Sequence, residues 1–157
     1  MSDERVVFWF RQDLRLTDNP AFTAAVKAGS VIPVYILDDV NAGQYKMGSA
    51  SRVWLHYSLL ALDKALEGKL CLFVGDAKKV LTALLKQEGV KEIFWNRCYE
   101  PWRICRDKKI KDCLQKLGME VKTYNGSLLW EPWEVLKSDG TPYKVFTPYY
   151  KNGCLRL

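Results

Sequence analysis

The stretch VVFWFRQDLRLTDNP, residues 6–20, runs from an unbroken apolar segment directly into a charged loop. Val6–Phe10 has the composition of a strand that is covered on both faces, as in a parallel sheet. Arg11, Asp13 and Arg15 follow it at once. Polar side chains at the carboxyl end of such a strand indicate a functional loop. An ion pair between Asp13 and Arg15 that only fastens the loop is an open alternative.

Strand-like and helical segments alternate along most of the chain. Apolar and β-branched composition predicts strands over 6–10, 31–37, 70–74, 92–95 and 120–124. Helical spacing predicts helices over 20–28, 51–66, 77–87 and 103–117. The apolar residues expected on the inner faces of the second and fourth of these helices are Val53, Leu55, Leu59, Leu62, Leu66, Ile110, Cys113, Leu114 and Leu117. Right-handed crossovers favour the strand order 3-2-1-4-5. We therefore predict an α/β fold, a Rossmann-like doubly wound five-stranded parallel sheet with helices on both faces.

The regular alternation of strands and helices stops after Tyr124. The remaining residues carry several turn signals but no further strand–helix unit. We predict an α/β domain over residues 1–130 and a C-terminal extension, or the start of a linker, over residues 131–157.

Composition restricts the class of protein. The 157 residues suffice for one domain with a buried core, and the net charge of +6 is a modest indication of an anionic partner. Five cysteines without a CxxC pair and a single histidine, His56, favour reduced thiols over disulfides or a zinc site. No apolar segment has the length of a membrane span, and the N-terminus lacks a signal-peptide pattern. We therefore predict a cytoplasmic protein without a membrane partner.

Three loops of the predicted sheet gather polar and aromatic residues. The first and fourth strands are neighbours at the switch point, where doubly wound proteins bind ligands. The loops after them are RQDLRLTDN (11–19) and NRCYEPWR (96–103), and LDDVNAGQYKMGSASR (37–52) borders the same crevice. Neither GxGxxG nor GxxxxGK[ST] is present. With one histidine for any Ser or Cys nucleophile, hydrolytic catalysis is disfavoured.

Four segments carry a family resemblance. They are FWFRQDLRLTDNPAF (8–22), MGSASRVWLHYSLLALDKAL (47–66), WNRCYEPWRICRD (95–107) and PYKVFTPYYKNG (142–153). In this order and spacing they resemble the N-terminal domain of DNA photolyases and cryptochromes, most closely that of the bacterial cyclobutane pyrimidine dimer photolyases. The resemblance extends from about Val6 to Leu155.

The resemblance implies the N-terminal domain of a deoxyribodipyrimidine photolyase, a carbon–carbon lyase that repairs DNA with light. In that family FAD and the catalytic site lie in a larger helical domain, which we do not expect in this chain. The α/β domain binds a second, antenna chromophore. We therefore expect a module that is inactive alone and meets DNA through the full-length enzyme. A subunit completed by a separate FAD-binding chain, and a stand-alone nucleotide- or flavin-binding protein of this fold, are alternatives.

The resemblance also implies a chromophore site at the switch point. Its matching positions are Arg11, Ile36, Leu37, Asp38, Arg52, Cys98, Tyr99, Glu100, Trp102, Arg103 and Arg106. Guanidinium groups suit ring carbonyls, ribityl oxygens or phosphate, and the carboxylates suit ribityl hydroxyls.

Three of these positions depart from family patterns. Trp102 and Arg103 replace the Asn-Glu pair of the best-known folate site, so a deazaflavin or FMN is favoured over methenyltetrahydrofolate. Cys98 replaces an acidic residue that is common in deazaflavin binders. No catalytic or metal-binding residue is predicted.

Two possible surfaces complete the predictions. Residues 97–116 carry a net charge of +4, which is typical of a solvated helix face or, alternatively, of a phosphate-binding surface. Phe146, Tyr149 and Tyr150 belong to an aromatic segment without an evident place in the sheet. An exposed patch of this kind favours self-association.

Overall fold

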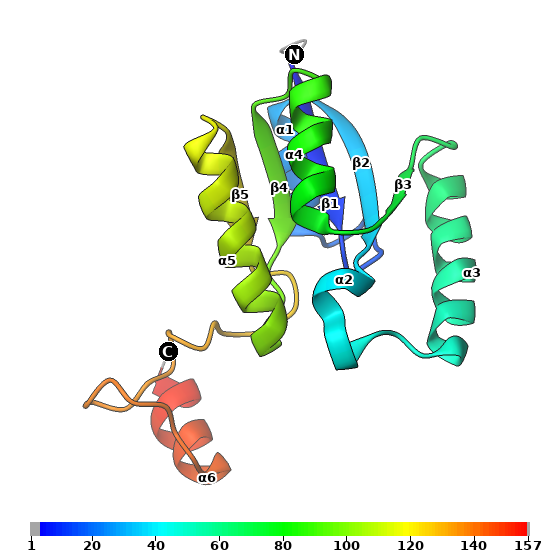
Figure 1. Cartoon of the computed structure of the whole chain (residues 1–157). Coiled ribbons are helices and arrows are strands. Elements are labelled where there is room, and N and C mark those ends of the chain that lie inside the picture. The colour runs from blue at the N-terminus through cyan, green and yellow to red at the C-terminus, as the bar shows by residue number, and fades with distance from the viewer. Residues whose placement is uncertain (1–3, 157) are drawn as a thin grey trace. The chain divides into compact units, whose positions relative to one another are not determined.

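The computed structural model describes residues 4–156, and its core is a five-stranded parallel sheet (Figure 1). The strands lie in the order β3-β2-β1-β4-β5, which confirms the predicted fold class. Their bounds are β1 (Arg5–Phe10), β2 (Ser30–Leu37), β3 (Cys71–Val74), β4 (Glu92–Asn96) and β5 (Glu120–Tyr124).

Four helices connect the strands, close to the predicted ranges. They are α1 (Pro20–Ala28), α3 (Ser49–Ala65), α4 (Ala77–Gln87) and α5 (Pro101–Lys116). The start of α1 is set by Asn19, whose side chain accepts a hydrogen bond from the backbone nitrogen of Phe22, with Pro20 at the first helical position. A short helix, α2 (Asp39–Ala42), and a 3₁₀ turn, η1 (Gly43–Tyr45), precede α3 and were not predicted.

Side chains of β1 alternate between two apolar cores, one on each face of the sheet. Val7 and Trp9 pack with residues of α4 and α5, whereas Phe8 and Phe10 pack with α1 and α3. Figure 1 shows α4 and α5 side by side along one face. Because both faces of β1 are covered, its apolar run has no polar interruption.

Two of the residues expected on inner faces, Val53 and Leu117, are exposed, so the prediction was wrong for these two. The face of α3 toward the sheet contains Leu62 and the half-buried Leu55. At about 100° per residue, Val53 lies half a turn away from Leu62. Leu117 is the residue that ends α5, where the chain leaves the helical path.

Helix α3 is held loosely. Its only buried side chain in the described part of the chain is that of Leu62, and Trp54 is 79% exposed. Beside it, the edge strand β3 leaves Val74 77% exposed. Within residues 4–156 no helix is both long and apolar enough to cross a membrane.

The chain forms two compact units, one up to Gly126 and the other from Ser127. The second unit contains α6 (Phe146–Pro148), a π-helical segment η2 (Tyr149–Gly153) and a 3₁₀ turn η3 (Cys154–Arg156). An antiparallel bridge joins Leu136 to Pro142. A Cβ atom at Gly153 would lie 2.4 Å from Val135, so a glycine is needed for this packing.

Asn96, at the end of β4, fastens the loop after β1. Its amide nitrogen donates to Asp13 (2.7 Å) and Asn19 (2.8 Å), and its oxygen accepts from the backbone nitrogen of Ala21 (3.3 Å). Arg15 instead donates to backbone carbonyls, those of Asp18 and Gly126. The polar residues after the first strand are therefore used in part to close the sheet's carboxyl edge.

A double-mutant cycle tests this fastening. A Cβ at Gly126 would lie 2.5 Å from the Asn96 side chain, so Gly126→Ala is expected to lower the free energy of unfolding by about 1–3 kcal/mol. In an Asn96→Ala background the same change is expected to cost less, because the contacts with Cγ (2.5 Å) and Nδ2 (2.7 Å) of Asn96 are removed and only that with its Cβ (2.9 Å) remains. Equal costs in the two backgrounds, measured by urea unfolding, would contradict the contact.

Candidate functional site

A cavity of about 960 Å³ lies in the first unit, at the carboxyl ends of β1 and β2. The start of α5 contributes Trp102, Arg103 and Arg106 to its lining, and α3 contributes Trp54 and Ser58. The cavity thus occupies the edge of the sheet where the sequence predicted a site. Seven predicted site residues line it: Arg11, Ile36, Leu37, Asp38, Trp102, Arg103 and Arg106.

Arg11 forms the floor of the cavity, and most of its donors are used within the protein. Its side chain is 2% exposed, forms an ion pair with Asp107 and donates to the backbone carbonyl of Asn96. The guanidinium carbon lies 5.1 Å from the ring centre of Trp9 and 5.9 Å from that of Trp95. Arg11 therefore joins the ends of β1 and β4 to α5.

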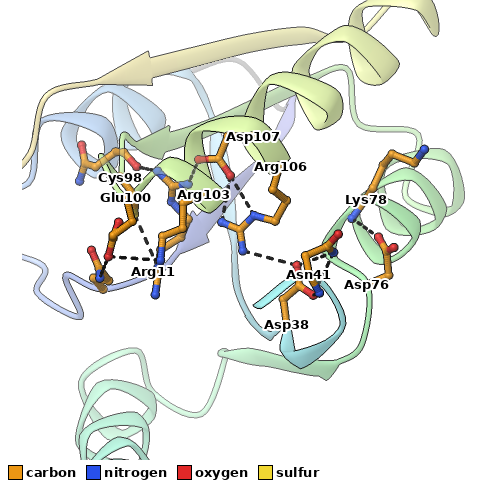
Figure 2. A network of polar contacts seen from close by, with 12 residues as sticks. Arg11, Asp38, Asn41, Asp76, Lys78, Cys98, Glu100, Arg103, Arg106 and Asp107 are labelled. Carbon is orange, nitrogen blue, oxygen red and sulfur yellow. Dashed lines mark hydrogen bonds and ion pairs between the residues drawn. The ribbon is translucent and has the colours of Figure 1, made fainter. Parts of the chain in front are cut away.

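Arg106 makes a second ion pair with the same carboxylate. It donates to Asp107 at 2.9 and 3.0 Å and lies 3.4 Å from Asp38 (Figure 2). Its guanidinium also lies between two rings, 4.9 Å from Trp9 and 5.1 Å from Trp102. Arg106 thereby links α5 to the loop that follows β2.

Asp107 is the residue that sequence reasoning missed. In the sequence it is one of the acidic residues of the positively charged segment 97–116, yet in the structure it forms ion pairs with both buried guanidiniums. Its spacing offered one signal, since it lies four residues after Arg103 and next to Arg106. The spacing could not show that the side chain turns inward.

Asp38 and Arg52 are engaged around α2. The Asp38 carboxylate caps α2 and accepts from the Asn41 backbone nitrogen at 3.0 Å and from its side-chain amide at 2.9 Å. Arg52 pairs with Asp39 at 2.5 Å and donates to the Met47 carbonyl at 3.0 Å. Arg52 does not line the cavity.

Three predicted residues of the loop after β4 also lie outside the cavity lining: Cys98, Tyr99 and Glu100. Glu100 accepts a hydrogen bond from Gln12 at 2.5 Å and lies 3.4 Å from Arg103. Burial raises the pKa of the Cys98 thiol, which is therefore protonated near neutral pH. Tyr99 is within 3.5 Å of the Asn125 side chain.

The α3 wall of the cavity was not predicted from sequence. Trp54, Ser58, Ala61 and Ala65 face the cavity at helical spacing. These side chains are small apart from Trp54, so they leave room beside the sheet. The helical spacing of these four residues is visible in the sequence, but the leucines of the same helix form a more conspicuous apolar stripe.

The cavity combines flat aromatic walls with positive charge. Arg11, Arg15, Arg103 and Arg106 line it, against only Asp38 and Asp39 of opposite sign. Burial raises the pKa of Tyr35, another lining residue, so its hydroxyl stays a neutral hydrogen-bonding group.

This set of donors fits a planar ligand that carries hydrogen-bond acceptors or an anionic group. Among residues 4–156 the buried Nε atom of Arg11 has no hydrogen-bond partner, and that of Arg103 has only the Glu100 carboxylate nearby, at 3.4 Å. In the same residues no group of His, Cys, Asp and Glu is arranged to hold a metal ion.

Sequence comparison identifies relatives along nearly the whole chain. A family model described as DNA photolyase matches residues 6–157. The chain is 43% identical over 150 residues to a deoxyribodipyrimidine photo-lyase of Agrobacterium fabrum, covering 93% of this chain and 31% of the relative. It is 39% identical to cryptochrome-1 of Arabidopsis thaliana, and the match covers 96% of this chain and 23% of that relative. The chain thus spans about a quarter to a third of the length of these relatives.

Solved structures agree with the sequence matches. A bacterial class III photolyase from Agrobacterium tumefaciens matches with a TM-score of 0.86 and 39% identity, over 97% of this chain and 32% of that chain. An archaeal photolyase from Sulfolobus tokodaii, which was described with two FAD molecules and a novel light-harvesting cofactor, matches with a TM-score of 0.74 and 28% identity, over 96% and 35%. The fold and the resemblance stated from sequence are confirmed.

Removal of the shared carboxylate tests the cavity floor. Asp107→Ala is expected to lower the free energy of unfolding by about 3–5 kcal/mol, because the buried Arg11 guanidinium loses its counter-ion and Arg106 keeps only Asp38 at 3.4 Å. Asp112→Ala, on the exposed side of the same helix, is the matched control and is expected to change it by less than about 0.5 kcal/mol. Similar values for both variants in urea unfolding would show that Asp107 is dispensable.

Proposed function

The chain belongs to the DNA photolyase family, and on that basis we propose that its first unit binds a light-harvesting chromophore in the cavity. The observation that carries the proposal is the cavity itself. Its volume of about 960 Å³ lies at the upper end of the range typical of small-molecule sites, about 300–1,000 Å³. It lies at the carboxyl ends of β1 and β2, and the carboxyl edge of the sheet is where such folds bind ligands.

Each wall has a distinct part in holding the ring system. Trp102 is fixed by the guanidiniums of Arg103 and Arg106, which lie 4.8 and 5.1 Å from its ring centre. Trp54 offers a second aromatic surface from α3. Arg103 presents a charged group to acceptors on the ligand. When bound, the chromophore supplies light absorption and transfer of the excitation to a flavin.

A flavin or deazaflavin suits this site better than a folate. The cationic lining favours the phosphate of a flavin nucleotide, and the cavity extends along the sheet beneath α3. The archaeal relative described with two FAD molecules provides a precedent for a flavin as the second chromophore. Methenyltetrahydrofolate remains the competing ligand.

Repair of DNA is proposed only for a full-length photolyase. The chain spans about a third of its photolyase relatives, so we propose that FAD, the catalytic site and most DNA contacts belong to a helical domain. No acid, base or nucleophile is required of the cavity residues, because transfer of excitation involves no bond change. The five unpaired cysteines are consistent with a cytoplasmic protein.

A second candidate function is that of a subunit completed by a separate FAD-binding chain. It is supported by an exposed aromatic pair in the second unit. Phe146 is 73% exposed and stacks on Tyr150, with 5.8 Å between the ring centres and an angle of 8° between the ring planes. A stacked pair of this kind suits burial against another protein surface.

Titration with FMN tests the chromophore site. Replacement of Trp54 by Ala is expected to weaken FMN binding about two- to tenfold, because a ring contact worth about 0.5–1.5 kcal/mol is removed. Trp133→Ala, an exposed tryptophan outside the cavity lining, is expected to leave the affinity unchanged. Quenching of FMN fluorescence gives the dissociation constants. If neither FMN nor methenyltetrahydrofolate binds the unaltered protein, the proposal fails.

Sedimentation measurements test the exposed aromatic pair. The unaltered protein is expected to associate as its concentration rises, and Phe146→Ser/Tyr150→Ser is expected to remain monomeric. Leu129→Ser, which removes a separate exposed apolar side chain, is the control. A separately produced FAD-binding domain should bind the unaltered chain and the control but not the double variant. If the protein stays monomeric at every concentration and does not bind this domain, the aromatic pair serves neither self-association nor binding of a separate FAD-binding chain.

A further inference from the structure

The positive charge of the protein is concentrated in one helical layer. Helix α4 carries three lysines and no acidic residue, and α5 carries six basic and two acidic residues. The net charge of the two helices together, +3 on α4 and +4 on α5, is +7 and exceeds the net charge of +6 of the whole chain. On the other face, α1 and α3 together contain three basic residues and one acidic residue. The positive charge carried by the helices is therefore concentrated on the α4–α5 layer.

Most of this charge points into solvent. Six lysines are exposed on the two helices: Lys78, Lys79, Lys86, Lys108, Lys109 and Lys116. Among residues 4–156 none of the six takes part in an ion pair, unlike Lys69 and Lys122. None of them lines the chromophore cavity.

The inward position of Asp107 strengthens the positive surface. Its carboxylate is used by Arg11 and Arg106 beneath the helix, so it does not neutralise the neighbouring Lys108 and Lys109. Asp112 is the only acidic side chain on the exposed side of α5. With Asp107 turned inward, the outer side of α5 carries three exposed lysines against the single carboxylate of Asp112.

The two helices arrange these lysines in two neighbouring rows. Both helices follow strands of a parallel sheet and contact each other along one face (Figure 1). At about 1.5 Å of rise per residue, Lys78 and Lys86 are separated by about 12 Å, and Lys109 and Lys116 by about 10 Å. Packed helices lie about 8–10 Å apart. Such a surface spans several phosphates of a duplex, which carries about one charge per 1.7 Å.

We propose that this lysine surface, defined by the six exposed lysines of α4 and α5, binds the phosphate backbone of double-stranded DNA. The contact is independent of base sequence, because lysine is a flexible point charge and the exposed sides present no arginine fork for base edges. The interaction goes beyond chromophore binding and uses a different part of the fold. It adds an electrostatic docking surface to the α/β unit.

The experiment measures anisotropy of a fluorescent, undamaged 20-base-pair duplex between 50 and 200 mM NaCl. Four or five phosphate contacts predict a slope of log K against log salt of about −4. Lys108→Gln/Lys109→Gln is expected to make the slope less steep by about 2 units. Lys27→Gln/Lys64→Gln, on α1 and α3, removes the same charge and is expected to leave the slope unchanged. All four lysines are exposed, so circular dichroism should show intact folds.

Three results would overturn the proposal. The first is no duplex binding at 50 mM NaCl. The second is an equal effect of the two double variants, which would show that only net charge matters. The third is tighter binding to vesicles that contain phosphatidylserine than to the duplex, which would assign the surface to a membrane. FMN titration of the same variants separates this proposal from the chromophore site, because none of the four lysines lines the cavity.

Discussion

One carboxylate between two buried guanidiniums organises the carboxyl edge of this sheet. Asp107 receives Arg11 from the end of β1 and Arg106 from its own helix, and Arg11 also reaches the carbonyl of Asn96 at the end of β4. Buried ion pairs contribute little net stability compared with apolar packing, but an unpaired buried charge is costly. The arrangement therefore fixes where β1, β4 and α5 meet, and the rings of Trp9 and Trp95 lie against the two guanidiniums.

This network also explains why the cavity has one rigid side and one loosely held side. Its floor is formed by strand ends and the first turns of α5, which are tied together by charge and by aromatic rings. Its opposite wall is α3, which contributes Trp54 and small side chains to the space. A ring held against the floor has a defined orientation relative to the sheet. A light-harvesting chromophore needs such an orientation, because excitation transfer depends on the relative geometry of donor and acceptor.

The sequence was informative where one physical cause dominated. Uninterrupted apolar runs such as Val6–Phe10 identify strands covered on both faces, and Asn19-Pro20 marks a helix start. Helix α2 was not predictable, because four residues carry no periodicity. At the site, the sequence indicated which loops meet, but not which hydrogen bonds and ion pairs their side chains form. Arg11 was expected to offer its donors to a ligand and gives most of them to Asp107 and Asn96, while Trp54 was overlooked beside the leucine stripe.

The slight attachment of α3 has a consequence for how this fold diversifies. Helix α3 contributes one fully buried side chain, Leu62, and half-buried leucines to the core, so most of its surface can change without disturbing the strands. The side chains that α3 contributes to the pocket can therefore change during evolution without changes in the sheet. The α3 wall and the arginine–aspartate floor are thus separate parts of one pocket, and side chains of the wall can change while the ion pairs of the floor stay intact.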